Sequence, residues 1–387
     1  MKVLIAIDSF KGCISSVEGS KAIELGVRDV FPYAEIVALP LADGGEGTVE
    51  ALFHAIGGTL VELNVSGPLS QERNAQYGIL EDGKTAVIEV AEACGLACVP
   101  PNQRNPLLAT TYGVGQLILD ALEKGCKEFI IGLGGSATND GGIGMLQALG
   151  FRFLNEEGVE VGLGGQELQN IQSVDVKQVV PELANVHFKI ACDVNNVLHG
   201  PTGASRIFGA QKGATPEMVE FLDEGLRQFA DVIGSQLNID LQNSPGAGAA
   251  GGLGAAFSGF LQADLQSGIE LIMNIISMEE KMLGVDFVIT GEGKLDDQTA
   301  MGKAPLGVAR LAAKNRIPVI ALAGAVPTNA AGLNELGITS CFSIANGPML
   351  LEEAMDFEVA FNNLRGTAMQ LFRMIQSVSR KAERLHK

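Results

Sequence analysis

Residues 3–30 read VLIAIDSFKGCISSVEGSKAIELGVRDV. The apolar run Val3–Ile7 predicts a strand and is followed by a polar loop. The tetrapeptide Ser15-Ser16-Val17-Glu18 then forms a capping box, in which Ser15 and Glu18 can each satisfy a free amide at the start of a helix. We expect that helix to run to about Val30. A strand, a loop and a helix in this order are the repeating unit of α/β proteins.

The same alternation continues along the chain. The other clear strands are predicted at Glu35–Leu39, Glu128–Gly132, Phe188–Cys192, Asp286–Thr290, Val319–Ala323 and Thr339–Ile344. Helical patterns fit between many of them. Thr215 before Pro216, for example, is typical of an N-cap with proline at the first helical position. The pattern predicts an α/β protein with a mainly parallel sheet.

One stretch departs from this pattern. Gln76–Leu80 and Thr85–Val90 flank the turn residues 81–84, as two strands of a hairpin would. Residues 78–85 also match the phosphate-loop pattern GxxxxGK[ST], but that motif needs a strand before it and a helix after it. The turn chemistry explains these residues, so we interpret them as an antiparallel hairpin and not as an ATP-binding loop.

The change to antiparallel strands marks an insertion into the parallel pattern. The carboxy-terminal helix, Glu352 to about Lys387, could pack back onto the first strands, which would make one domain discontinuous. We therefore predict two domains. The first, a parallel-sheet α/β domain, comprises residues 1–64 and 275–387, and the second, an inserted α/β domain, comprises residues 65–274.

Composition excludes several classes of protein. The chain of 387 residues carries 27 Lys and Arg against 45 Asp and Glu, a formal charge of −18, which argues against nucleic-acid binding. No signal peptide is visible, and polar residues interrupt each apolar run before the roughly 20 residues that a bilayer requires. The six cysteines show no CxxC pairing. We expect a cytoplasmic protein without membrane contact, and both a monomer and a homodimer stay open.

Two glycine-rich segments, residues 130–144 and 246–254, are candidates for binding phosphate groups. The first follows a predicted strand and opens a helix, where backbone amides favour an anion, and the second contains GxGxxG at Gly246, Gly248 and Gly251. The candidate nucleotide-binding residues are Gly134, Gly135, Ser136, Thr138 and Asn139 in the first segment and Gly251 and Gly252 in the second. Close packing of helices is the alternative for both. Gly132, Gly134 and Ala137 also fit the weaker dinucleotide pattern GxGxxA, which leaves a dehydrogenase open.

Carboxylates and lysines follow the predicted strand Asp286–Thr290. Such a position, beyond the carboxyl end of a strand, is where open α/β sheets bind ligands. Glu292 and Asp296 could hold magnesium, which takes one or two carboxylates together with phosphate oxygens, and Lys303 could contact phosphate. A solvated acidic loop is the alternative interpretation.

Three other strands end in similar residues. Asp8 could accept the proton of a substrate hydroxyl, and Lys11 could pair with a carboxylate or phosphate, although an ion pair would explain both. The further candidates are Asp193 for catalysis and Ser9, Asp43, Glu46 and Asn195 for contact with substrate.

Taken in order, these segments resemble the class I glycerate kinases. The matching pieces are residues 8–12 with Ser15, 42–48, 132–142, 192–195, 248–254 and 290–305. The resemblance implies phosphorylation of D-glycerate by ATP with Mg²⁺ to give the 2-phosphate. It also implies a flavodoxin-like domain built from both chain ends around an inserted domain, with the active site in the cleft. The positions carried over are Asp8, Lys11, Asp43, Asp193, Glu292 and Asp296.

Three other functions stay open at this point. One is a kinase of another small hydroxy acid, because pocket size depends on tertiary contacts that the sequence does not give. Another is a NAD(P)-dependent dehydrogenase, on the glycine pattern at Gly132. The third is a sensor that binds a small organic acid without turnover.

Overall fold

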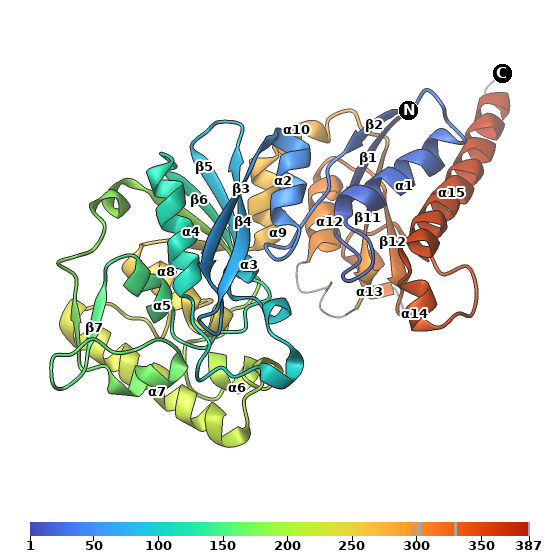
Figure 1. The fold of residues 1–387 in the computed structure, drawn as a ribbon. Coiled ribbons are helices and arrows are strands. Elements are labelled where there is room, and N and C mark those ends of the chain that lie inside the picture. Colours follow the sequence, from blue (N-terminus) through green and yellow to red (C-terminus); the bar gives the residue numbers. More distant parts are fainter. Residues whose placement is uncertain (297–298, 300–302, 329–330, 386–387) are drawn as a thin grey trace. The chain divides into compact units, whose positions relative to one another are not determined.

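The computed structural model describes the backbone of residues 1–296, 299, 303–328 and 331–385, which Figure 1 shows as a ribbon. The chain forms two compact units. The smaller consists of Met1–Asp43, Glu50–Ile56 and Ile269–Lys387, and the larger of Gly44–Val49 and Gly57–Gly268. Among the described residues, no helix combines the length and the apolar character needed to cross a membrane.

The predicted domain boundaries differ from these units in detail. Strand β3 (Gly58–Ser66) pairs with β4 (Glu72–Leu80), so residues 58–64 belong with the larger unit. Helix α9 (Gly268–Ile275) belongs almost entirely with the smaller unit. As a division into domains, residues 1–64 with 275–387 around 65–274 stays a prediction.

The smaller unit contains one parallel sheet of five strands, in the order β13-β12-β11-β1-β2. The strands are β1 (Lys2–Ile7), β2 (Glu35–Ala38), β11 (Phe287–Lys294), β12 (Val319–Ala325) and β13 (Ser340–Ser343). Its helices are α1 (Ser16–Arg28), most of α2 (Thr48–Ile56), α9, α10 (Met278–Lys281), α12 (Ala304–Lys314), α13 (Ala331–Glu335), α14 (Leu351–Ala354) and α15 (Phe357–Leu385). Counted along the chain within this unit, the strand order is 2-1-3-4-5, which is the flavodoxin-like order. The predicted fold class is confirmed.

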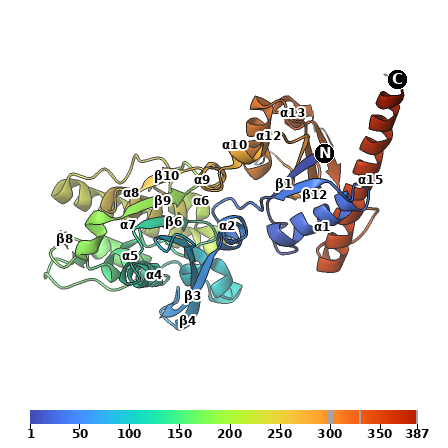
Figure 2. The same cartoon turned by 90° about the horizontal axis from the view of Figure 1, so that it is seen from above.

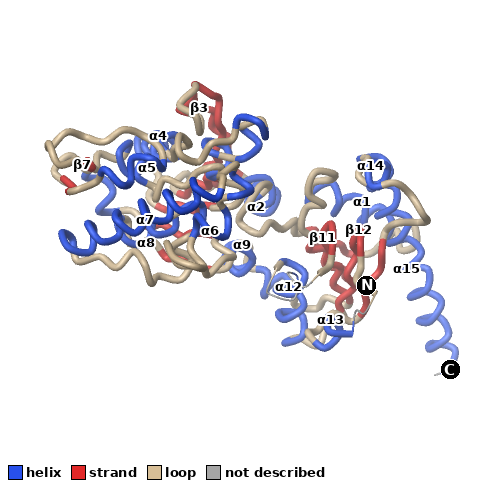
Figure 3. The backbone as a smooth tube through the Cα atoms, turned by 90° about the horizontal axis from the view of Figure 1, so that it is seen from below, coloured by secondary structure: helices blue, strands red, loops and turns tan. Residues whose placement is uncertain are grey.

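Both ends of the chain build this unit. Figures 2 and 3 show α1 and α15 on one side of the sheet and α12 on the other. Gly26 of α1 has no side chain, and a Cβ atom there would lie 2.3 Å from the carbonyl oxygen of Arg365 in α15. The Arg365 guanidinium donates to the Asp29 carboxylate at 2.9 and 3.1 Å. The carboxy-terminal helix therefore packs onto the first helix, α1, whereas the sequence analysis expected it on the first strands.

The larger unit contains a mixed sheet of six strands, in the order β10-β9-β6-β5-β4-β3. The pairs β10–β9, β9–β6 and β6–β5 are parallel, whereas the pairs β5–β4 and β4–β3 are antiparallel. The remaining strands are β5 (Thr85–Glu89), β6 (Glu128–Gly132), β9 (His187–Ala191), β10 (Asp264–Gln266) and the separate pair β7 (Arg152–Leu154) and β8 (Ser173–Asp175). The helices are α3 (Val90–Cys94), α4 (Tyr112–Glu123), α5 (Ile143–Ala148), α6 (Ala204–Phe208), α7 (Pro216–Leu237) and α8 (Leu253–Phe260).

The structure confirms the hairpin and the predicted N-caps at Ser15 and Thr215. Gly78 pairs with Val87 across the antiparallel β4 and β5, so residues 78–85 form a turn between strands and no phosphate loop. Ser15 accepts a hydrogen bond from the Glu18 amide at 3.2 Å. Thr215 accepts one from the Met218 amide at 3.3 Å, with Pro216 at the first position of α7.

Candidate active site

A cavity of about 420 Å³ lies within the smaller unit at the carboxyl ends of its strands. Strands β1 and β11 are parallel neighbours, and the Asp8 amide donates to the Gly291 carbonyl at 2.9 Å. Sequence order reverses between these two strands, because β2 follows β1 on one side and β11 lies on the other. Such a switch point is where open α/β sheets bind ligands. Among the predicted site residues, the lining contains Asp8, Ser9, Lys11, Asp43, Glu292, Asp296 and Lys303.

Glu292 lies in a strand and not in the predicted loop. Strand β11 continues to Lys294 because its pairing with β12 continues past Gly291, with Glu292 opposite Ala323 and Lys294 opposite Ala325. Gly291 permits this close approach, since a Cβ atom there would lie 2.1 Å from the Leu322 carbonyl oxygen. The carboxylate is consequently held on a rigid element.

Asp8 is the most strongly perturbed acid in the cavity. Its side chain is buried, with 3% exposed, and burial together with the nearby charge of Asp43 raises its pKa to about 7. The Ser9 amide, 2.6 Å from Asp8 Oδ1, and the charge of Lys11 offset only part of this shift. A carboxyl group that titrates near neutral pH is suited to accept a proton.

Lys11 and Asp43 form an ion pair beside Asp8. The distance from Lys11 Nζ to Asp43 Oδ2 is 3.0 Å, and Lys11 is 62% exposed while Asp43 is 15% exposed. Burial alone would lower the pKa of Lys11, but Asp43 together with the charges of Asp8 and Glu292 outweighs this effect, and the net pKa is raised. Lys11 is therefore a fixed positive charge at the rim of the cavity. A pair as exposed as this contributes little to stability.

Glu292 and Asp296 are linked through Thr299. The Thr299 hydroxyl donates to Glu292 Oε1 at 2.5 Å and accepts from the Asp296 amide at 2.9 Å. Burial raises the pKa of Glu292, although the Thr299 hydrogen bond and Lys303 oppose the rise. Within the described ranges, no three His, Cys, Asp or Glu side chains converge as a metal site. Two hard carboxylates fit magnesium that arrives with its phosphate ligands, because Mg²⁺ commonly binds one or two carboxylates and substrate phosphates.

The two glycine-rich segments pack against each other in the larger unit. Gly141 donates to the Gly251 carbonyl at 3.0 Å, and a Cβ atom on Gly252 would lie 2.7 Å from the Gly141 Cα atom. Of the candidate nucleotide-binding residues, Ser136, Thr138, Asn139, Gly251 and Gly252 are buried, whereas Gly134 is half-buried and Gly135 is exposed. Close packing thus explains the glycines of the second segment. Of the candidate nucleotide-binding residues in the two segments, only Gly134 and Gly135 reach the surface.

Sequence reasoning missed Lys212. This fully buried lysine donates from Nζ to the Thr138 carbonyl at 2.6 Å and to the Ser136 hydroxyl at 3.2 Å, and burial lowers its pKa to about 8. Its ammonium group therefore lies in direct contact with the first glycine-rich segment. Lys212 follows Ser136 by 76 residues, and no local motif links the two positions.

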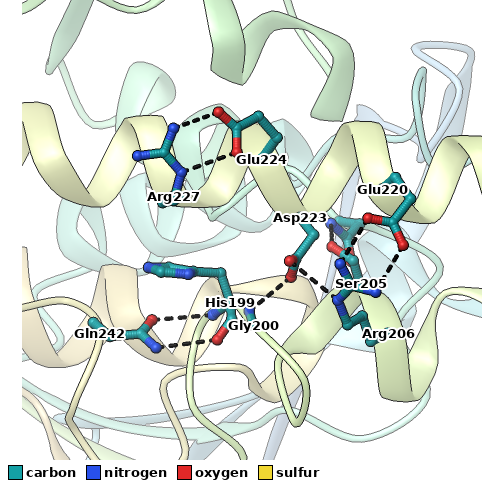
Figure 4. Close-up of polar contacts among 10 residues, drawn as sticks. His199, Gly200, Ser205, Arg206, Glu220, Asp223, Glu224, Arg227 and Gln242 are labelled. Carbon is teal, nitrogen blue, oxygen red and sulfur yellow. Dashed lines mark hydrogen bonds and ion pairs between the residues drawn. The ribbon is translucent and has the colours of Figure 1, made fainter.

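Asn139 is held by Ser205, which Figure 4 shows beside its neighbouring ion pairs. Its amide donates to the Ser205 hydroxyl at 3.0 Å, at the start of α6. The next residue, Arg206, makes two hydrogen bonds of 2.7 Å to Glu220 of α7 and one of 3.3 Å to Asp223. These ion pairs hold α6 against α7. Because Ser205 belongs to α6, they also hold its hydroxyl where it can bind Asn139 of the glycine-rich segment.

The remaining predicted residues, Glu46, Asp193 and Asn195, are exposed and belong to the larger unit. They are not among the residues that line the cavity of the smaller unit. Asp193 Oδ1 accepts hydrogen bonds from the Gly268 amide at 2.9 Å and the Ser267 hydroxyl at 3.3 Å, both of which belong to the larger unit.

Glu89 is a second residue that the sequence analysis missed. Its buried carboxylate accepts from the Val49 amide at 2.9 Å and the Gly47 amide at 3.3 Å, at the start of α2. Burial raises its pKa to about 7. Glu89 and Gly47 are 42 residues apart, which again leaves no local signal.

Comparison with known proteins assigns the family. The family model described as "Glycerate kinase family" matches residues 3–376. The chain belongs to the glycerate kinase family. It is 47% identical to the glycerate kinase of Bacillus subtilis (strain 168) over 371 residues, which are 96% of this chain and 97% of that one. It is also 47% identical to the glycerate 2-kinase of Escherichia coli (strain K12) over 364 residues, 94% and 95% of the two chains.

A related crystal structure has the same fold. A protein from Salmonella typhimurium LT2 is 44% identical, with a TM-score of 0.89 over 98% of this chain and 99% of that chain. Membership of the glycerate kinase family confirms the resemblance and favours a kinase over a dehydrogenase. The glycine pattern at Gly132 has a packing cause, because a Cβ atom there would lie 2.2 Å from the Gly44 carbonyl oxygen.

Proposed function

We propose that this protein transfers the γ-phosphoryl group of ATP to the 2-hydroxyl of D-glycerate. The observation that carries the proposal is the gathering of Asp8, Lys11 and Glu292 at the switch point of the sheet, in a chain of the glycerate kinase family. The 47% identity to a glycerate 2-kinase supports the 2-hydroxyl as the acceptor.

Each charged residue of the lining is assigned the role that its side-chain chemistry allows. Lys11 binds the glycerate carboxylate, and Asp8 orients the attacking hydroxyl and accepts its proton. Glu292 and Asp296 hold Mg²⁺, while Lys303 at the start of α12 contacts phosphate. Magnesium, when bound, supplies positive charge that neutralises the phosphate oxygens. Phosphoryl transfer depends chiefly on such positioning and electrostatic stabilisation.

The reaction can be tested by phosphorus NMR. The purified protein is incubated with ATP and Mg²⁺ and, in separate samples, with D-glycerate, L-glycerate, L-lactate, tartronate or erythronate. We expect a 2-phosphoglycerate signal from D-glycerate alone. A 3-phosphoglycerate signal would overturn the acceptor position, and phosphorylation of erythronate in preference to glycerate would favour a kinase of another hydroxy acid.

The pH dependence follows from Asp8. The base must be ionised to accept a proton, and its pKa is raised to about 7, so kcat/KM for glycerate should rise with pH and reach half its plateau near that value. Initial rates from pH 5.5 to 8.5, with a coupling system checked at each pH, measure this profile. A flat profile across pH 7 would remove Asp8 as the base.

Removal of Lys11 should weaken substrate binding. A hydrogen bond to a charged group contributes roughly 1.5–3 kcal/mol, so Lys11→Ala should raise the KM for glycerate roughly 10- to 150-fold. The matched control is Lys21→Ala, an exposed lysine of α1 outside the cavity lining. If Lys11→Ala raised the KM for ATP and left the KM for glycerate unchanged, Lys11 would contact the phosphates of ATP and not the carboxylate of glycerate.

A further inference from the structure

The lining of the cavity in the smaller unit includes apolar residues to which the roles proposed above assign nothing. Beyond the charged residues, its lining continues over Ile344, Met349, Leu351, Met355 and Ala360. These residues follow β13 or belong to the segment from α14 to the start of α15. Glycerate has three carbons, of which one carries a carboxylate and two carry hydroxyls, so it has no apolar surface to place there.

The size of the cavity leads to the same conclusion. A volume of about 420 Å³ lies in the range of sites that enclose ligands of drug size, which is roughly 300–1,000 Å³. The lining carries four carboxylates and three lysines, from Asp8, Asp43, Glu292, Asp296, Lys11, Lys294 and Lys303, and most of its other residues are apolar, which we call the apolar half. A single ligand that fits both halves has a charged end that carries a metal and a flat apolar end.

We propose that the cavity binds the whole nucleoside triphosphate, with its adenine ring in the apolar half between β13 and α14. The choice of ATP as the occupant rests on the proposed function. Methionine side chains favour aromatic partners, because their sulfur is polarisable and their shape adapts, and Met349 and Met355 lie in this half. The triphosphate then lies toward Lys303 and Glu292, at the switch point of the sheet.

An amide pair supplies hydrogen-bonding groups for the edge of the ring. Asn363 of α15 lines the cavity and is 8% exposed, and its side-chain oxygen accepts a hydrogen bond from the amide of Asn346.

The absence of tryptophan from the sequence allows a direct test. Leu351 lines the cavity and is 74% exposed, while its neighbour Leu350 is 75% exposed and is not part of the lining. In Leu351→Trp the introduced indole should be quenched by the non-hydrolysable analogue AMP-PNP with Mg²⁺, in a saturable manner. Leu350→Trp should show no saturable response. Glycerate and inorganic tripolyphosphate should not quench either variant.

A second pair of variants measures affinity. Ala354 of α14 lines the cavity, whereas the preceding Glu353 is exposed and does not. Ala354→Trp fills the apolar half and should raise the dissociation constant of AMP-PNP at least tenfold by calorimetry, while the KM for glycerate changes less than twofold. Glu353→Trp should leave both values unchanged.

The outcomes separate this proposal from the proposed function. If AMP-PNP binds the wild-type protein but neither quenches Leu351→Trp nor binds Ala354→Trp more weakly, the adenine site is wrong even where phosphoglycerate forms. The proposal is equally wrong if AMP-PNP does not bind the wild-type protein, or if glycerate quenches Leu351→Trp. If quenching occurs and no phosphoester forms with glycerate, the adenine site stands and the proposed function fails.

Discussion

Replacing Asp8 by asparagine should lower kcat by about 10²–10⁴-fold, which is the usual contribution of a positioned general base. Asparagine has the same shape and can still accept the hydrogen bond that Asp8 Oδ1 takes from the Ser9 amide at 2.6 Å. It cannot accept a proton from the substrate. The measurement is the rate of 2-phosphoglycerate formation at saturating ATP and D-glycerate. Near-normal turnover in Asp8→Asn would remove this residue from the mechanism.

The same variant should be more stable than the wild-type protein at pH 8, and this separates lost chemistry from misfolding. Burial and Asp43 raise the pKa of Asp8 in the folded protein above its value in the unfolded chain, so the folded state binds the proton more tightly. Stability is therefore lost as pH rises through about 7, where the buried carboxyl must ionise. Asparagine avoids this cost. We expect a higher Tm for Asp8→Asn at pH 8 and a smaller difference at pH 5, and a lower Tm at pH 8 would contradict the assignment.

Gly251→Ala should destabilise the larger unit by roughly 2–5 kcal/mol, the sum of two costs. The backbone at Gly251 is left-handed, with φ of +72°, and an L side chain in that conformation costs roughly 1–2 kcal/mol. In addition, a Cβ atom would lie 2.1 Å from the Thr138 carbonyl oxygen and 2.6 Å from the Asn139 Cα atom. Forcing such contacts in a packed interior costs roughly 1–3 kcal/mol.

Gly158 provides the matched control for this prediction. Its φ of +75° is nearly the same, but no atom lies within 4 Å of a Cβ built there. Gly158→Ala should therefore lose only the conformational part, roughly 1–2 kcal/mol. Urea denaturation of both variants, followed by circular dichroism, gives the comparison. Equal losses in the two variants would show that the glycine-rich segments are not packed together as tightly as the structure indicates.

The sequence predicted an element correctly where the residues of one short segment are enough to determine that element. Strand β6 begins and ends at the predicted Glu128 and Gly132, because an apolar run followed by glycines specifies both the strand and its end. The turn residues 81–84 identified the hairpin against a formal phosphate-loop match. Strand β11 was predicted too short, because its extension through Glu292 comes from pairing with β12 and not from its own residues.

The pattern of residues was enough to establish an α/β chain, with acidic and basic side chains after its strands, since strand periodicity, caps and turns act over a few residues. It could not pair β1 with β11, whose partners Val3 and Phe287 meet only when the sheet forms. It likewise did not indicate Lys212 or Glu89. Lys212 forms a hydrogen bond with a residue 74 positions away, and Glu89 with a residue 40 positions away. The raised pKa of Asp8 and the apolar half of the cavity depend on burial, and burial is a property of the packed chain and not of any segment within it.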